Sequence, residues 1–318
     1  MKVVAAEDLA RLAPHGDVVE ALREAFGARY VAPLRHHHEI DRGSAPAATY
    51  LLMPAWSDMS AGDGATGFVG LKTVLVVPDN PARGMPTVQA TYQLFSGQTG
   101  SLLAVFDGTE LTLRRTACAS GLAASYLARP QASRMVIVGA GALAPHMVRA
   151  HAAVRPIRHV AVWSRTRAHA EALARSLSEE GFEADVPDAL EAAVGQADIV
   201  SCATTSAEPV VLGNWLKAGV HVDLVGAFRP TMREVDGVAV ANARVFVDTR
   251  EGALSEGGDL IQAIAEGVFK PDQVEAELSE LVTGAHPGRS GADEITLFKS
   301  CGTALEDLAT AIMVYRRL

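Results

Sequence analysis

The sequence predicts an α/β protein of two domains, one built on a doubly wound parallel sheet and the other a discontinuous α+β domain. Three observations carry this prediction. Short apolar runs alternate with helical stretches in the second half, longer strand-like runs follow one another closely in the first half, and a strand-like run with a helical stretch ends the chain. Alternating strands and helices indicate βαβ units, whereas closely spaced strands favour an antiparallel sheet.

The first half begins with a helical pattern and continues with strands. Val18, Val19, Leu22 and Phe26 recur at helical spacing, and Asp17 precedes them as a candidate N-cap. Four strand-like runs follow: TYLLMPAW, GFVGLKTVLVVP, TVQATYQLF and SLLAVFDG. The segment SGQTG separates the last two and predicts a hairpin. The stretch 109–129 is rich in Ala and Leu, contains no proline, and indicates a long helix.

The second half carries five short apolar runs: MVIVGAG, HVAVWSR, ADIVSCATT, HVDLVGAF and ARVFVDT. Helical stretches separate the first three, which predicts a parallel sheet. At the end, EITLFKSCG indicates a strand and TALEDLATAIMVYRRL an amphipathic helix. We expect that helix to return to the first domain. The predicted domains are therefore 1–118 with 293–318, and 119–292.

The composition favours an acidic, soluble enzyme. The formal net charge of the 318 residues is −9, whereas binding the phosphates of a nucleic acid needs clustered Lys and Arg that the chain does not show. No apolar run reaches the roughly 18 residues of a membrane span, and charged residues near the start replace the apolar segment of a signal peptide. Cys118, Cys202 and Cys301 are far apart and suit a reducing compartment. We therefore expect a cytoplasmic protein without nucleic-acid or membrane partners.

A glycine turn follows the strand-like run 134–138. The sequence Gly139-Ala140-Gly141-Ala142-Leu143-Ala144 matches the pattern G-x-G-x-x-A and leads into a helical stretch. Gly139 permits the tight turn, Gly141 lets the backbone approach a pyrophosphate, and Ala144 allows close packing of helix and strand. The pattern predicts a Rossmann-type dinucleotide site; the alternative is a glycine turn in another kind of doubly wound domain.

The end of the next strand bears on the choice of dinucleotide. Sites that prefer NAD carry Asp or Glu there, bound to the ribose 2′-hydroxyl. This chain has Ser164, Arg165 and Thr166, and an Arg beside two hydroxyls suits a 2′-phosphate. We therefore favour NADP(H), with NAD(H) as the alternative. In a structural interpretation, Ser164 or Thr166 caps the next helix and Arg165 points into water.

Many segments together resemble the ornithine cyclodeaminase/μ-crystallin family over nearly the whole chain. They include LLMPAW, GLKTV, GMPTVQATYQLF, DGTELTLRRTACASGLAA, VGAG, VFVDT and ITLFKSCGTALEDLA. Within the family, ATTSAEPVV, VGAFRPTMREVD and HPGR are most similar to bacterial Δ1-pyrroline-2-carboxylate and Δ1-piperideine-2-carboxylate reductases. The resemblance implies a homodimer whose first domain binds a small imino or amino acid and supplies the dimer interface, and whose second domain binds the cofactor.

The resemblance also implies roles for individual residues. Lys72 matches a substrate lysine, although a Lys in an alternating strand more often faces solvent. Arg115 matches a second carboxylate-binding residue, with Arg114 as its alternative; its planar guanidinium suits bidentate pairing. Arg35 and Thr87 are further substrate contacts. The residues expected to contact the cofactor are Gly139, Gly141, Ala142, Leu143, Ser164, Arg165, Thr166, Thr204, Val225 and Gly226.

Phe228 separates the candidate activities. Cyclodeaminating members of the family carry an Asp at this position, and cyclodeamination requires a group that shuttles protons. Phe228 cannot do so, but it could pack against a small ring. The sequence therefore favours an NAD(P)H-dependent ketimine reductase that forms proline or pipecolate, with Asp223 and Glu234 as less favoured acids. The alternatives are an NAD-dependent ornithine cyclodeaminase and a μ-crystallin-like protein that binds NADPH without turnover.

Two further features have plain structural interpretations. His36, His37 and His38 invite a metal site, but alternate residues of a strand point to opposite faces, and no other ligand cluster lies near them in the sequence. A polar loop or edge strand is favoured, with no metal. Cys202 ends a strand-like run without an evident His partner, and we interpret it as a small buried residue.

Overall fold

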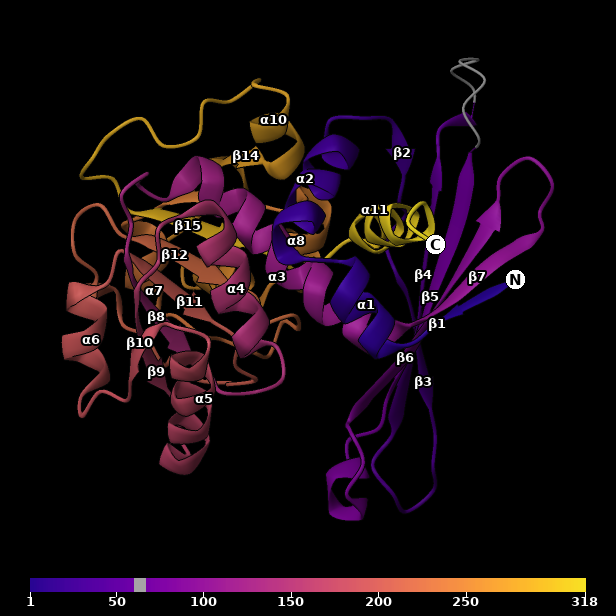
Figure 1. Cartoon of the computed structure of the whole chain (residues 1–318). Helices are drawn as coiled ribbons and strands as arrows, with labels where there is room; N and C mark the ends of the chain where they lie inside the picture. Colours follow the sequence, from indigo (N-terminus) through magenta and orange to yellow (C-terminus); the bar gives the residue numbers. More distant parts are fainter. Residues whose placement is uncertain (60–66) are drawn as a thin grey trace. The chain divides into compact units, whose positions relative to one another are not determined.

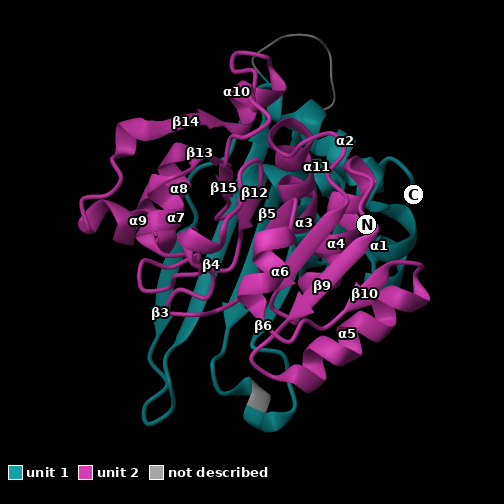
Figure 2. Ribbon diagram, turned by 90° about the vertical axis from the view of Figure 1, so that its left-hand side faces the viewer, with its two compact units in different colours: residues 1–115, 303–318 teal, residues 116–302 magenta. Residues whose placement is uncertain are grey.

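The computed structural model describes residues 1–59 and 67–318. It divides into two compact units, Met1–Arg115 with Thr303–Leu318, and Thr116–Gly302 (Figure 2). The first boundary falls inside the helix α3 (Gly108–Leu127), which belongs to the predicted helix 109–129. The first unit is discontinuous, because the last helix of the chain returns to it.

Within the described residues, the first unit holds a seven-stranded sheet in the order β1-β7-β6-β5-β4-β2, with β3 also paired to β4. All pairings are antiparallel except that of β1 with β7, and β6 and β7 form the predicted hairpin. The strands are β1 (Lys2–Val4), β2 (Tyr30–Val31), β3 (His36–Ile40), β4 (Ala48–Ser57), β5 (Phe68–Val76), β6 (Val88–Ser96) and β7 (Leu102–Asp107).

Besides the start of α3, three helices and a short 3-10 turn complete the first unit in the part of the chain that is described. They are α1 (Ala6–Leu12), α2 (His15–Phe26), η2 (Asn80–Arg83) and α11 (Ala304–Tyr315). The helix α11 lies against α2 and against β4, β5 and β6 (Figure 1). The buried positions Val18, Val19, Leu22 and Phe26 of α2 are those of the predicted helical pattern, which buries one face as an amphipathic helix does.

The second unit is a parallel sheet of eight strands among its described residues, in the order β10-β9-β8-β11-β12-β15-β13-β14. Its central strands are apolar and buried, as expected where both faces of a parallel sheet are covered. Its strands are β8 (Arg134–Val138), β9 (His159–Trp163), β10 (Glu183–Asp185), β11 (Ile199–Cys202), β12 (His221–Leu224), β13 (Arg244–Val247), β14 (Val274–Glu277) and β15 (Thr296–Lys299).

The order of strands reverses at β8, which lies between β9 and β11. In doubly wound sheets, ligands bind at such a switch point, beyond the carboxyl ends of the strands. The helices of this unit are α4 (Ala144–Val154), α5 (Arg167–Glu179), α6 (Leu190–Gln196), η3 (Gly213–Trp215), α7 (Gly237–Ala241), α8 (Arg250–Glu256), α9 (Gly258–Ala265), η4 (Pro271–Gln273) and α10 (Leu278–Val282).

The second predicted boundary is corrected by the structure. Residues 293–302 were predicted in the first domain, but β15 pairs with both β12 and β13 in the parallel sheet. Its four residues are all buried, as expected for an interior strand of a parallel sheet whose two faces are covered. The return to the first unit therefore begins at Thr303, ten residues after the predicted position.

Two other sequence interpretations can be compared with the structure. His36, His37 and His38 begin β3, an exposed strand that pairs only with β4 among the described residues, so the edge-strand interpretation applies. Cys202 is the last residue of β11 and is fully buried. No helix in the described part of the chain combines the length and the apolar character that crossing a membrane requires.

Candidate functional site

The glycine turn follows β8 at the carboxyl edge of the parallel sheet. Gly139 has a φ of +113°, a conformation that L side chains rarely adopt. Its amide donates to the carbonyl of Trp163 over 2.8 Å, and a Cβ built on it would lie 2.6 Å from the carbonyl oxygen of Ala203. Both the turn and the close approach to the loop after β11 therefore require glycine here.

The start of α4 is open in the way that a pyrophosphate requires. Gly141 and Ala142 are exposed, Leu143 is half-buried, and a Cβ built on Gly141 would meet no atom within 4 Å. Leu143 occupies the N-cap position without a side-chain cap, and proline follows in the first turn. The amides of a helix start favour anions through their free N–H groups and the helix dipole. These residues fit a dinucleotide.

The end of β9 keeps its hydroxyls and its Arg near the surface. Ser164 is half-buried, and its Oγ accepts a hydrogen bond of 3.4 Å from the amide of Thr166. Thr166 stands at the N-cap of α5 but makes no side-chain cap bond. Arg165 is exposed. The hydroxyl of Ser164 thus shapes the turn, and the guanidinium of Arg165 is accessible to a ligand.

The loops after β11 and β12 meet on one buried acid. The amide and the hydroxyl of Thr204 donate to Oε1 of Glu234 over 2.6 and 2.9 Å, and the amide of Gly226 donates to Oε2 over 2.7 Å. Burial, followed by the charge of Asp259, raises the pKa of Glu234 to about 7. The structure therefore joins the predicted residues Thr204 and Gly226, next to the buried Val225, through an acid that sequence reasoning had given little weight.

Phe228, which follows β12, and Asp223, inside β12, make different contacts. Phe228 is half-buried, and the guanidinium carbon of Arg229 lies 5.8 Å from its ring centre. Asp223 lies inside β12, fully buried, where Oγ of Ser201 donates to it over 2.8 Å. That carboxylate is therefore a core group of the sheet, as its place in the strand predicts.

In the first unit, four charged side chains form a buried cluster. Nζ of Lys72 lies 2.9 and 2.8 Å from the two carboxylate oxygens of Asp307. Arg115 donates from Nε to Asp307 over 3.1 Å and from Nη1 to Glu306 over 2.6 Å. Lys72 is 1% exposed and Arg115 4%, while both acids are fully buried. Two cations and two carboxylates thus balance one another.

The burial and the charges of this cluster bring the pKa of Lys72 close to neutral pH. Burial, then the charge of Arg115, lowers the pKa of Lys72 to about 7 against the opposing charge of Asp307. The half-buried Arg35 lowers this pKa further, so it lies within electrostatic reach. Burial acts against the charge of Arg115 as well, but Asp307 and Glu306 more than compensate and raise its pKa.

Local structure explains why Lys72 is buried rather than exposed. The alternation of β5 places Lys72 on the same face as Gly70 and Val74, and α11 packs against that strand. On α11, Glu306 also completes a capping box with Thr303. Sequence reasoning singled out neither acid; for Glu306, the pattern T-x-x-E before an apolar run is explained by helix capping alone.

Tyr92 is a further member of the cluster that the sequence did not single out. It lies opposite Lys72 on β6 and is fully buried. Burial, then the charge of Asp307, raises the pKa of its hydroxyl well above the ordinary value. A Cβ built on Gly70 would lie 1.8 Å from this hydroxyl, so glycine at position 70 makes room for the ring.

The remaining substrate candidates lie outside the cluster. Arg114 donates to Glu110 and to the carbonyl of Ala13, so Arg115 is the arginine that shares an acid with Lys72. The carbonyl of Thr87 accepts from the amide of Val77 at the end of the β5–β6 ladder. Five residue steps of about 3.4 Å along β5 put this position roughly 17 Å from Lys72 within the unit.

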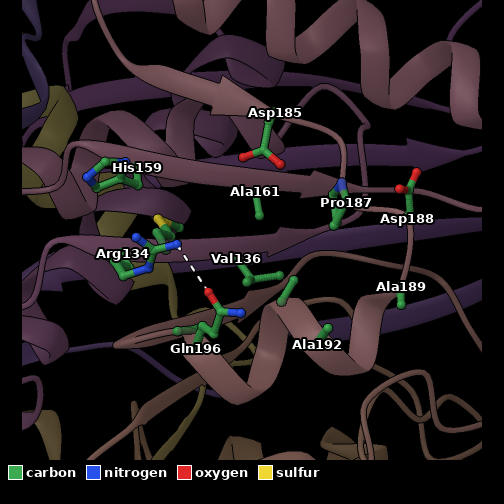
Figure 3. A pocket seen from close by; sticks show the side chains of 13 residues that line it. Arg134, Val136, His159, Ala161, Asp185, Pro187, Asp188, Ala189, Ala192 and Gln196 are labelled. Carbon is green, nitrogen blue, oxygen red and sulfur yellow. Dashed lines mark hydrogen bonds between the residues drawn. The ribbon is translucent and has the colours of Figure 1, made fainter.

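The second unit has a hollow beside α6 (Figure 3). Arg134 and His159, the first residues of β8 and β9, line it, and Arg134 donates to Gln196 on α6 over 3.4 Å. None of the expected cofactor residues lines it in the described structure. The hollow is therefore distinct from the glycine turn, which follows the last residue of β8.

Comparison with known proteins identifies the family. The sequence model of the ornithine cyclodeaminase/mu-crystallin family matches residues 44–318. A Delta(1)-pyrroline-2-carboxylate reductase of Paracoccus denitrificans is 41% identical over 303 residues, covering 94% of this chain and 92% of that protein.

Solved structures of similar proteins agree with this comparison. The structure of Thermococcus litoralis Delta(1)-pyrroline-2-carboxylate reductase in complex with NADH and L-proline superposes with a TM-score of 0.92 at 34% identity, covering 100% of this chain and 97% of that one. An archaeal alanine dehydrogenase dimer with bound NAD superposes with a TM-score of 0.90 at 31% identity, covering 99% and 95%.

The fold, the glycine turn and these relatives define an NAD(P)-dependent oxidoreductase that acts on carbon–nitrogen double bonds. The chain belongs to the ornithine cyclodeaminase/mu-crystallin family. The predicted family and fold class are thereby confirmed, as is the nicotinamide cofactor.

The buried cluster yields a test of stability. Asp307→Asn removes the carboxylate that Lys72 and Arg115 share, and breaking a buried ion pair costs about 3–5 kcal/mol. We expect urea denaturation at pH 6, where Lys72 is protonated, to show a loss of that size in the free energy of unfolding. The matched change Glu20→Gln removes an exposed ion pair with Arg23 and should cost less than about 1 kcal/mol. Equal losses of unfolding free energy in the two variants would contradict a stabilising role for the buried cluster.

Proposed function

We propose that the protein reduces cyclic ketimine carboxylates, Δ1-pyrroline-2-carboxylate to proline and Δ1-piperideine-2-carboxylate to pipecolate, with NADPH favoured over NADH. The observation that carries this proposal is the buried pair of cations Lys72 and Arg115 on a shared carboxylate. Such cations suit a small substrate whose carboxylate must be neutralised. The names of the relatives, which include reductases of this class, also support it.

In the proposed mechanism, the reduced nicotinamide supplies the hydride. Lys72 and Arg115 bind the substrate carboxylate, with Arg35 adding positive charge. Asp307 and Glu306 hold these cations before substrate arrives, so little side-chain entropy is lost on binding. The contribution of the protein is mainly orientation and neutralisation of charge, because holding two reactants in the right geometry can supply much of the catalysis.

Phe228 favours reduction over cyclodeamination. A protonated ring imine is already electrophilic, so it accepts a hydride without further proton transfer at carbon. Cyclodeamination has to release ammonia and close a ring, and both steps move protons. Phe228 carries no titratable group, and its side chain is suited to packing against a five- or six-membered ring. Ornithine cyclodeaminase activity is therefore the alternative that the assay below tests.

The preference for NADPH rests on the end of β9. Ser164, Arg165 and Thr166 offer a guanidinium and two hydroxyls where a site that prefers NAD carries an acid. The remaining proposed contacts, from the glycine turn to Thr204 and Gly226, serve either dinucleotide.

We also propose a homodimer that works in the cytoplasm. One structural relative is a dimer with bound NAD, and dimers with twofold symmetry are the commonest oligomers. The three cysteines of the chain are buried and not in disulfides, which suits a reducing compartment.

The activity is tested with two pairs of reactants. Purified protein is mixed with NADPH and Δ1-pyrroline-2-carboxylate, and separately with NAD and L-ornithine. We expect the absorbance of the reduced nicotinamide to fall with the imine, proline to form, and ornithine to release no ammonia. Ammonia and proline from ornithine, without consumption of NADPH by the imine, would instead establish a cyclodeaminase.

The cofactor preference is tested with Arg165→Ala. Loss of a charged hydrogen bond to a 2′-phosphate should weaken the binding of NADPH by about tenfold or more and leave the binding of NADH nearly unchanged. The dissociation constants are measured by titrating nicotinamide fluorescence. Arg167→Ala is the control, because Arg167 is also exposed and pairs with Glu171 on α5. Similar losses for both cofactors would show that Arg165 does not recognise the phosphate.

The role of Lys72 is tested by its titration. With its pKa lowered to about 7, Lys72 is an ammonium below that pH and a neutral amine above it, so carboxylate binding should weaken as the pH rises. Pyrrole-2-carboxylate is a suitable probe, because its carboxyl stays ionised from pH 6 to 9. We expect its inhibition constant to rise above pH 7 in the wild type and to stay level in Lys72→Arg, whose guanidinium remains charged. Parallel profiles would refute the assignment.

A further inference from the structure

Three loops meet at the carboxyl edge of the parallel sheet in the second unit. They follow β8, β11 and β12, which are neighbours in the sheet. A Cβ on Gly139 would lie 2.6 Å from the carbonyl oxygen of Ala203, and one on Gly226 would lie 1.9 Å from that of Thr204. The loops are therefore packed backbone against backbone and form a continuous surface.

The carboxylate of Glu234 accepts hydrogen bonds from two of these loops, those after β11 and β12. Oε1 accepts from the amide and hydroxyl of Thr204, and Oε2 accepts from the amides of Gly226 and Ala227, the last at 3.3 Å. The residue is fully buried. A carboxylate that accepts from main-chain N–H groups in two loops fixes the path of the backbone, rather than the position of a side chain.

Glu234 is itself held by a second acid. The amides of Glu234 and Val235 donate to Oδ1 of Asp259 over 2.7 and 3.2 Å, and Nζ of Lys299 donates to Oδ2 over 2.9 Å. At the start of α9, a Cβ on Gly258 would lie 2.0 Å from the carbonyl oxygen of Met232. The support thus runs from the last residue of β15, through α9, to the two loops.

We propose that Glu234 is a positioning residue for the nicotinamide half of the cofactor, through the loops after β11 and β12. In a doubly wound sheet the pyrophosphate lies at the glycine turn after the first strand, and the two nucleotides lie to either side of it. The residues that suit a 2′-phosphate follow β9, on one side. The nicotinamide half therefore belongs over β11 and β12, on the other. This inference rests on the nicotinamide cofactor and not on which imine is reduced.

The chemistry of the contact indicates the variant to use. A glutamine at position 234 keeps the shape but offers one acceptor oxygen, so its amide group would face N–H donors on one of the two loops. A buried donor left without an acceptor costs about 1–3 kcal/mol. The affected loop should move away from the position set by the carboxylate.

The experiment compares two ligands that differ only in the nicotinamide. The dissociation constants of NADH and of ADP-ribose are measured by calorimetry for the wild type and for Glu234→Gln. We expect NADH to bind about tenfold more weakly to the variant and ADP-ribose to change by less than about twofold. Equal weakening of both ligands, or no change in either, would overturn the proposal.

Two further variants keep the test decisive. Glu266→Gln is the matched control, since Glu266 pairs with the neighbouring Arg233 near the surface; both affinities should stay as in the wild type. Glu234→Asp keeps the charge but shortens the reach, so the same selective loss for NADH is expected even where the Gln variant fails to fold. Failure of the wild type to bind NADH would reject the cofactor itself, whereas a loss unselective between the ligands would reject only the role of Glu234.

Discussion

The ion pairs of the Asp307 carboxylate with Lys72 and Arg115 are the contacts on which the first unit depends. Lys72 on β5 and Arg115 on α3 are both buried, and a buried charge without a partner costs several kcal/mol. Their acids stand on α11, at the end of the chain. The last helix must therefore pack on the first sheet, and the unit is discontinuous for electrostatic reasons as well as for packing. The same contacts fix the two cations that we propose bind the substrate carboxylate.

In the second unit, buried carboxylates are stabilised mainly by hydrogen bonds from the backbone. Glu234 and Asp259 accept chiefly from main-chain amides, and Lys299 is the cation beneath them. In the first unit, acids hold the side chains of two cations; in the second, acids hold the backbone of loops at the edge of a sheet. The first arrangement suits recognition of a small anion, and the second suits a surface on which the nicotinamide half of the cofactor is placed, as we propose.

Particular residues show how far sequence reasoning reached. The hairpin around SGQTG, the helix 109–129 and the glycine turn were predicted, because each depends on residues close together in the chain. The strand pattern by itself did not predict the burial of Lys72, since the alternation of β5 shows which residues share a face but not which face is covered. The position of β15 was missed for a similar reason: a short apolar run does not say which sheet it joins.

The sequence by itself determined the class of fold, many of the strands and helices, and the glycine turn after β8, because these follow from periodicity and from the conformations that glycine alone permits. Only the tertiary structure decided which acids meet which charges. Asp307 reaches Lys72 across 235 residues, and Glu234 reaches Thr204 across 30. Such pairings depend on how the elements pack. They leave no local pattern that identifies the partners, so the contacts of Glu306 and Glu234 could be recognised only once the chain was folded.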